Sequence, residues 1–380
     1  MTRNEEDFSP CRAWREIDLD ELALNAAALQ TALAPGCRLM AVLKADAYGH
    51  GALLAARRLY REGVRDFAVA CLEEGIQLRR QGLEGQILIL GYTSPLLAEE
   101  LARWNLTQTI VDEAHGRALS DRQVSIKVHL ALDTGMHRLG IPADDWQAIA
   151  RVYALPFLKI GSVFSHLCVC DGQGADDRAF TRLQLVRFYA ALAWMEKEGF
   201  HTGETHIQAS YGILNLPPQP CTLARAGIAL YGVRSQRGDT LRGMELRPVL
   251  SLRARVASVR WLEEGEGAGY GLAYRPQSQR KIAAITVGYG DGLPRQLAQK
   301  GGEVLIGGRR CPMVGRMCMD QLLADVTNLP DVKAGDTVTI LGRDGMETIS
   351  AEEAAEKCGT ITNELLARLG PRLPLIPVEA

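Results

Sequence analysis

Apolar runs alternate with segments of helical periodicity from residue 19 to residue 225. Residues 19–33 carry Leu and Ala at helical spacing, which predicts a helix there. Eight apolar runs predict buried strands at 38–43, 66–70, 86–90, 107–111, 125–132, 159–164, 206–209 and 223–225. Buried strands that alternate with amphipathic segments are typical of an α/β fold with a parallel (β/α)8 barrel of the TIM type.

The pattern changes after about residue 245 to short alternating strands. Turn signals such as Gly307-Gly308 and Gly342-Arg343-Asp344-Gly345 separate these strands. We therefore expect a barrel over 13–245 and a C-terminal, mostly antiparallel β domain over 246–380. The sequence leaves open whether residues 1–12 pack with the second domain.

Composition limits the classes of function. The chain has 380 residues, of which 47% are hydrophobic, and a formal net charge of -2. It is long enough for a barrel and a second domain, and its charge gives no basis for binding nucleic acid. No apolar run reaches the length of a transmembrane helix, and the charged start is unlike a signal peptide. We expect a cytoplasmic protein or the cytoplasmic catalytic part of a larger membrane-bound one.

The nine cysteines do not form a disulfide pattern. Their number is odd and their positions are scattered, so we expect reduced thiols. Cys168 and Cys170 share one face of a strand, but no second pair of soft ligands follows at the spacing of a zinc site. Structural cysteines and no metal are the expectation.

Polar residues gather where several predicted strands end. They are Lys44, Arg138, His166, Ser210 and Arg225. The carboxyl ends of the strands carry the chemistry in a (β/α)8 barrel, so we expect these side chains to form one site.

Lys44 stands at the end of the first predicted strand. Burial disfavours the ammonium form of a lysine, which lowers its pKa and frees the amine to form a Schiff base with an aldehyde. The alternative is a lysine that leaves the strand for solvent, as charged residues commonly do.

Several strings resemble one family in order along the chain. Ala41-Val42-Leu43-Lys44-Ala45-Asp46-Ala47-Tyr48-Gly49-His50-Gly51 is similar to the lysine motif of the fold-type III pyridoxal-phosphate racemases, the alanine racemase family. Matching strings follow at Asp133 to Gly140, Thr222 to Gly232, Gly269 to Gly271, Gly288 to Gly292 and Val314 to Gln321. The resemblance covers nearly the whole chain.

The resemblance implies a pyridoxal 5'-phosphate site in the barrel. Lys44 would carry the cofactor, and its phosphate would be bound by Tyr48, Ser210, Gly227 and Ile228. Arg225 would contact the pyridine nitrogen, and His166 would link this arginine to the catalytic tyrosine. Because guanidinium keeps its protons, the ring nitrogen would stay unprotonated and the ring would be a weaker electron sink, which suits racemisation.

The resemblance also implies residues that act on the substrate. Tyr270 would be the second base, contributed across the interface of a homodimer. Arg138 and the backbone of Met319 would hold the substrate carboxylate, and Tyr289 would stand at the entrance. Many members carry a carbamate-modified lysine at the position of Ala131. Because Ala131 cannot carry that anion, we expect a chloride ion or a carboxylate near Arg138.

Asn363 departs from the family string I-P-Y-E, in which a tyrosine lies next to the substrate side chain. The smaller amide would leave room for a serine hydroxyl and could hydrogen-bond to it; the alternative is an N-cap asparagine. The same change resembles the serine racemases of vancomycin-resistance clusters, which join a catalytic half to a membrane domain and supply D-serine for cell-wall precursors. The resemblance therefore implies racemisation of serine and, less well, of alanine.

Three other functions remain as alternatives. A housekeeping alanine racemase would use the same machinery. A PLP-binding barrel without turnover resembles the barrel alone, so the second domain with Tyr270 argues against it. A fold-type III decarboxylase is disfavoured by the strings around Tyr270 and Met319.

Overall fold

The computed structural model describes residues 11–238 and 240–378. These residues form two compact units, one of residues 22–232 and 240–246 and the other of residues 11–21, 233–238 and 247–378. Of residues 1–12, whose packing the sequence left open, residues 1–10 lie outside the described residues, and Arg12 donates to Asp291 Oδ2 at 3.1 Å within the second unit. We describe each unit by itself.

The first unit is a closed parallel barrel, as predicted. Its strands are β2 (Arg38–Val42), β3 (Asp66–Val69), β4 (Gln86–Ile89), β5 (Thr107–Ile110), β6 (Ile126–Asp133), β8 (Leu158–Phe164), β9 (Glu204–His206) and β10 (Leu223–Ala226). They follow the order β5-β4-β3-β2-β10-β9-β8-β6, and pairing of β5 with β6 closes the ring. All eight predicted strands are confirmed. The two-residue strand β7 (Ile141–Pro142) also pairs with β6.

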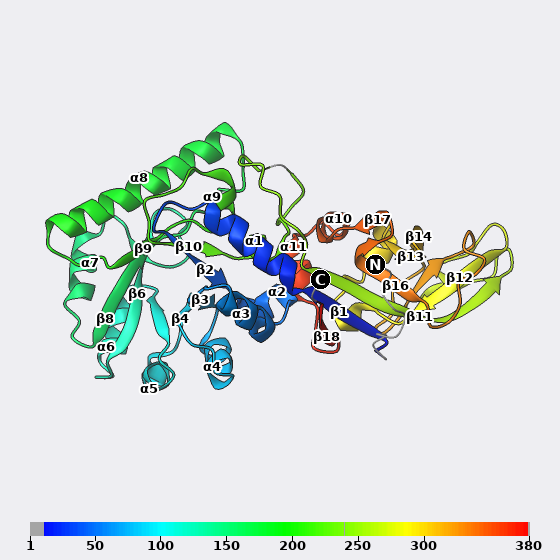
Figure 1. The fold of residues 1–380 in the computed structure, drawn as a ribbon, viewed down its shortest axis with the longest axis horizontal. Coiled ribbons are helices and arrows are strands. Elements are labelled where there is room, and N and C mark those ends of the chain that lie inside the picture. The colour runs from blue at the N-terminus through cyan, green and yellow to red at the C-terminus, as the bar shows by residue number, and fades with distance from the viewer. Residues whose placement is uncertain (1–10, 239, 379–380) are drawn as a thin grey trace. The chain divides into compact units, whose positions relative to one another are not determined.

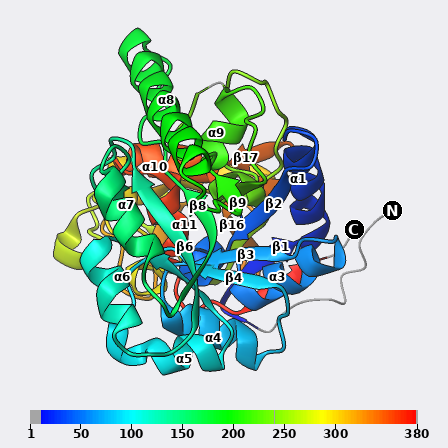
Figure 2. The same cartoon turned by 90° about the vertical axis from the view of Figure 1, so that its left-hand side faces the viewer.

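Helices surround the barrel, and Figure 2 shows α3 to α7 outside its strands. They are α1 (Leu19–Thr31), α2 (Lys44–Gly49), α3 (Ala52–Arg61), α4 (Leu72–Arg80), α5 (Ala98–Arg103), α6 (Glu113–Ser120), α7 (Trp146–Tyr153), α8 (Ala175–Lys197) and α9 (Ser210–Asn215). Strands covered on both faces need nearly continuous apolar residues. Strand β3 is an example, because all four of its residues are buried.

The second unit is built on a mostly antiparallel sheet, also as predicted (Figure 1). Its strands are β1 (Ala13–Asp18), β11 (Leu250–Leu262), β12 (Arg280–Ile285), β13 (Glu303–Ile306), β14 (Arg309–Val314), β15 (Leu322–Asp325), β16 (Thr337–Asp344), β17 (Glu347–Ile349) and β18 (Leu375–Val378). Its helices are α10 (Ala351–Lys357) and α11 (Thr362–Ala367). Strand β1, which the sequence did not predict, pairs antiparallel with β11 and parallel with β18.

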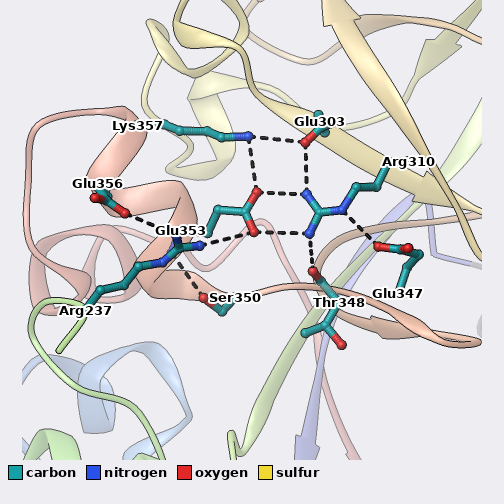
Figure 3. A network of polar contacts seen from close by, with 9 residues as sticks. All are labelled: Arg237, Glu303, Arg310, Glu347, Thr348, Ser350, Glu353, Glu356 and Lys357. Atoms are coloured by element: carbon teal, nitrogen blue, oxygen red, sulfur yellow. Dashed lines mark hydrogen bonds and ion pairs between the residues drawn. The ribbon is translucent and has the colours of Figure 1, made fainter. Parts of the chain in front are cut away.

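An ion-pair network crosses the second unit (Figure 3). The Arg310 guanidinium lies 2.8 Å from Glu353 and 2.9 Å from Glu303. Lys357 lies 3.1 Å from Glu353 on the same helix, and Arg237 lies 3.4 Å from Glu353. The network therefore attaches residues 233–238 to α10 and α10 to the β13–β14 hairpin.

Across the described ranges, none of the helices has both the length and the apolar composition needed to cross a lipid bilayer.

Candidate active site

Lys44 follows the buried strand β2 and is half-buried at its carboxyl end. Burial lowers the pKa of Lys44 below its ordinary value of 10.5, and the nearby cations Arg138 and Arg225 lower it further. Glu74 acts in the opposite direction. The net effect enlarges the fraction of neutral amine, which is the nucleophilic form.

The residues after Lys44 form a left-handed turn. Ala45, Asp46, Ala47 and Tyr48 all have φ between 52° and 55°. A left-handed conformation costs a residue other than glycine about 1–2 kcal/mol. The turn is held at its two ends, since Glu74 accepts the Ala45 N–H at 2.6 Å and the Asp46 carboxylate accepts the Ala52 N–H at 2.7 Å. Backbone strain of this kind is common at functional sites, where particular side chains must be held in fixed directions.

Three hydrogen-bond donors surround Gly227, which begins the 3-10 helix η2 (Ile228–Tyr231) as its N-cap. The Ser210 hydroxyl oxygen accepts the N–H groups of Gly227 at 2.9 Å and Ala229 at 3.2 Å. The Ser210 and Tyr48 hydroxyl hydrogens and the Ile228 N–H have no acceptor among the described residues. A Cβ atom on Gly227 would lie 2.7 Å from the Tyr48 hydroxyl oxygen.

This arrangement fits a phosphate group. All three donors belong to buried residues, and polar groups of buried residues are normally paired. Backbone N–H groups at the start of a helical turn are common ligands of phosphate. Only glycine at position 227 leaves space between the Tyr48 hydroxyl and the backbone.

Arg225 lies inside the barrel on β10 with 3% of its surface exposed. Its Nη2 donates to the Ser165 carbonyl at 2.7 Å and to His166 Nδ1 at 3.1 Å. Its Nη1 donates to His206 Nδ1. Burial lowers the pKa of Arg225 to about 10, so the guanidinium remains charged at neutral pH.

The Nε–H of Arg225 is left without an acceptor among the described residues. It is a donor that cannot become an acceptor. A ring nitrogen with a free lone pair fits such a donor.

His166 is neutral and has a defined tautomer. Burial, with the nearby cations Arg225, Arg138 and Lys44, lowers its pKa to about 3. Since Arg225 can only donate, His166 Nδ1 accepts and the proton of the ring lies on Nε2. The N–H at Nε2 is then available to orient a further group.

Arg138 is exposed and has no carboxylate partner among the described residues. Asp133, five residues earlier, contacts His137 instead, at 2.8 Å. Ala131 is buried and carries no charge. The carboxylate that we expected as one of two possible partners of Arg138 is therefore absent from the described residues.

The second unit holds the other predicted residues. Tyr270, in the 3-10 helix η3 (Tyr270–Leu272), is 68% exposed. Tyr289, in η4 (Tyr289–Asp291), donates its N–H to Cys318 O at 3.1 Å, next to the exposed Met319. The Met319 N–H has no acceptor among the described residues. Tyr289 and Met319 thus lie together.

Asn363 is not an N-cap. The N-cap of α11 is Ile361, and Asn363 is the second residue of the helix. Its Oδ1 is buried without a hydrogen-bond partner in the part of the chain that the structure describes. A buried acceptor left unpaired costs about 1–3 kcal/mol, which favours a role in binding over one in capping.

Two buried histidines were missed by the sequence reasoning. His206, the last residue of β9, binds Arg225 and stacks on Phe164 with ring centres 4.6 Å apart. His129 on β6 contacts His206 at 3.1 Å. The sequence could have indicated both residues, because His129 and His206 each lie in a predicted buried strand.

The comparisons with known proteins agree with this geometry. The family models described as alanine racemase, N-terminal domain, and alanine racemase, C-terminal domain, match residues 17–235 and 249–377. An alanine racemase of Clostridium difficile 630 superposes with a TM-score of 0.92 at 31% identity, over 98% of this chain and 97% of that chain.

Curated relatives include three racemases with different names. An amino-acid racemase of Enterococcus faecalis is 42% identical over 96% of this chain and 51% of that protein. A serine/alanine racemase of Enterococcus gallinarum is 40% identical over 95% of this chain and 51% of that protein. An alanine racemase of Geobacter sp. (strain M21) is 40% identical over 94% of this chain and 96% of that protein. The chain thus spans about half the length of the first two.

Proposed function

Because the chain belongs to the alanine racemase family, we propose that it is a pyridoxal 5'-phosphate-dependent racemase that interconverts L- and D-serine and, less well, L- and D-alanine. In this proposal it supplies D-amino acid for cell-wall precursors. The observation that carries the proposal is the pairing of a half-buried lysine of lowered pKa with the three unpaired donors around Gly227.

When bound, pyridoxal 5'-phosphate supplies an aldehyde that condenses with amines and a ring that withdraws electrons from the α-carbon. Lys44 would hold the cofactor by its amine, and Tyr48, Ser210 and Ile228 would bind the phosphate. Arg225 would donate its Nε–H to the ring nitrogen. Because the guanidinium does not release a proton, Arg225 would leave that nitrogen unprotonated.

Racemisation needs an acid and a base on opposite faces of the α-carbon. Lys44 serves one face with its neutral amine. Tyr270 of a second copy of this chain serves the other, and the exposure of Tyr270 within one chain is consistent with that role. His166 orients this tyrosine through its Nε2–H.

The substrate carboxylate is held by the Arg138 guanidinium and by the Met319 N–H. Tyr289 stands at the entrance. In place of the carbamate, a chloride ion binds near Arg138 in this proposal. Its support is the exposed guanidinium without a carboxylate partner among the described residues.

Serine preference rests on Asn363. Its unpaired Oδ1 can accept the hydrogen of a substrate hydroxyl. Such a hydrogen bond contributes about 0.5–1.5 kcal/mol, so alanine remains a substrate with a lower kcat/KM. The relative named serine/alanine racemase supports this choice, whereas the Geobacter relative favours alanine as the main substrate.

Two variants test the proposal. Lys44→Ala should lose both the visible absorbance of lysine-linked cofactor and racemisation of L-serine and L-alanine, and survival of that absorbance would refute the assignment of Lys44. Asn363→Tyr should lower kcat/KM for L-serine much more than for L-alanine. Equal losses for the two substrates, or none, would leave an alanine racemase without the serine preference.

A further inference from the structure

A continuous row of hydrogen-bonded side chains, called the file below, crosses the interior of the barrel. Its members are Arg225, His206, His129 and Gln86. His206 Nε2 lies 3.1 Å from His129 Nδ1, and His129 Nε2 lies 2.6 Å from Gln86 Nε2, the nitrogen of the side-chain amide. These side chains come from β10, β9, β6 and β4. His206 and His129 are almost wholly buried, at 0% and 1% exposure.

The direction of every hydrogen bond in this file follows from Arg225. A guanidinium has donors and no acceptor, so His206 Nδ1 must accept and the proton of that ring lies on Nε2. His206 Nε2–H then donates to His129 Nδ1, which places the proton of the second ring on Nε2 as well. The far end of the file therefore presents an N–H group to Gln86.

Gln86 must therefore accept a hydrogen bond from that N–H through its amide oxygen. A rotation of 180° about the last side-chain bond exchanges the amide oxygen and nitrogen, so the residue can present either atom at this place. With the nitrogen toward His129, two N–H groups would face each other at 2.6 Å. With the oxygen there, every group in the file is paired.

The alternative, an additional proton on either ring, is disfavoured. Burial lowers the pKa of His129 to about 3, and burial beside Arg225 lowers the pKa of His206 well below 6.5. A protonated His206 would also direct N–H groups at both of its neighbours. Both rings are therefore neutral at physiological pH.

We propose that Gln86 is a positioning residue for the racemase reaction: its amide oxygen accepts the N–H at the far end of the file and thereby holds the His129 and His206 rings in place against the Arg225 guanidinium. The proposal rests on the proposed function in one respect, the contact of Arg225 with the cofactor ring.

A charged residue at position 86 would not serve the same purpose. Gln86 and His129 line a cavity of about 610 Å³ together with Lys127, Lys159 and Glu204. A glutamate at position 86 would offer an acceptor and also a negative charge that stabilises a proton on His129. Glutamine gives the acceptor without the charge.

The direct test is the tautomer of each histidine in the protein without cofactor. The chain has 7 histidines, and 15N-histidine labelling with long-range 1H–15N NMR separates the two neutral tautomers and the cation. Resonances of His129 and His206 are assigned by replacing each in turn with asparagine. We expect the Nε2–H tautomer for both rings at pH 7. An Nδ1–H tautomer or a cation at either ring would overturn the proposal.

A matched pair of variants tests the role of Gln86. Gln86→Leu removes the acceptor, and Thr107→Val removes a hydroxyl that lines the same cavity but lies outside the file. Gln86→Leu should lower kcat by about 2- to 10-fold, the effect of one lost hydrogen bond, and shift the absorbance of bound cofactor, with KM for L-serine unchanged. Thr107→Val should change none of these.

Equal behaviour of the two variants would refute the positioning role. The test is separate from that of the proposed function, because the tautomers are read without cofactor. If Lys44→Ala kept the lysine-linked absorbance while both rings proved to be Nε2–H, the assignment of Lys44 would fail and the Gln86 file would stand.

Discussion

Replacing Gly227 with alanine should weaken binding of the cofactor phosphate without unfolding the barrel. The added Cβ would lie 2.7 Å from the Tyr48 hydroxyl oxygen and 3.3 Å from Tyr48 Cζ. The first distance is too short for any contact, so the tyrosine must turn away from the phosphate. The Gly227 N–H would still donate to Ser210.

The expected loss is one hydrogen bond to an anion. Such a bond contributes about 1.5–3 kcal/mol, and about 1.4 kcal/mol corresponds to a tenfold change in affinity. The Kd of pyridoxal 5'-phosphate for the apoprotein should therefore rise about 10- to 150-fold. Titration of the apoprotein, followed by the visible absorbance of bound cofactor, measures this change.

Three controls isolate the cause. Gly161→Ala makes the same substitution where a Cβ meets nothing within 4 Å, so its Kd should equal that of the unchanged protein. Pyridoxal, which lacks the phosphate, should bind the Gly227 variant as well as it binds the parent. In a double-mutant cycle with Tyr48→Phe, the second substitution should add little to the first. An equal loss for pyridoxal, or fully additive losses in the cycle, would refute the reasoning.

Three further predictions concern single residues. Arg138→Ala removes a cation that lowers the pKa of Lys44, so the pH at which the apoprotein captures cofactor at half its maximal rate should move upward. Tyr270→Phe should keep the cofactor bound, while exchange of the α-hydrogen with solvent fails first with the L enantiomer. Arg310→Ala should lower the free energy of unfolding by about 1–3 kcal/mol at pH 7. The reason is that Glu353 loses the partner that chiefly lowers its pKa below 4.5. This stabilisation is present above the pKa of Glu353 in the unfolded state and disappears as the pH falls through its pKa in the folded state.

Each of these predictions has a contrary result. An unchanged or lower midpoint pH in Arg138→Ala would mean that its charge does not act on Lys44. Equal loss of exchange from both enantiomers would argue against a base confined to one face. Lys333→Ala breaks an exposed ion pair with Asp336 and should cost at most about 1 kcal/mol. If Arg310→Ala lowered the free energy of unfolding by no more than Lys333→Ala does, the network in Figure 3 would contribute little to stability.

The barrel was predictable from the sequence because buried parallel strands need continuous apolar runs. The position of Lys44 followed from the same pattern. The left-handed turn over Ala45 to Tyr48 did not, since it contains none of the glycines that usually mark such a backbone. Tertiary contacts from Glu74, far along the chain, hold it.

The file of hydrogen bonds inside the barrel could not be predicted from the sequence either. Periodicity places His129 and His206 on buried strands, but only the closing of the barrel brings them within hydrogen-bonding distance of each other. Strand β1 was missed because Ala13–Asp18 mixes charged and apolar residues in a short run. Arg15 within it is buried and pairs with the carbonyl of Leu373, a partner that no local pattern reveals.

Strand β1 has a consequence for the order in which a growing chain folds. It is synthesised before the barrel strands, yet its sheet partners begin only at Leu250 and Leu375. All barrel strands lie between Arg38 and Ala226, so the barrel has its full set of strands while β1 still has no neighbour. Contacts between such distant segments form slowly. The second unit therefore completes its sheet after the barrel strands have been made, when β18 has been synthesised and can pair with β1.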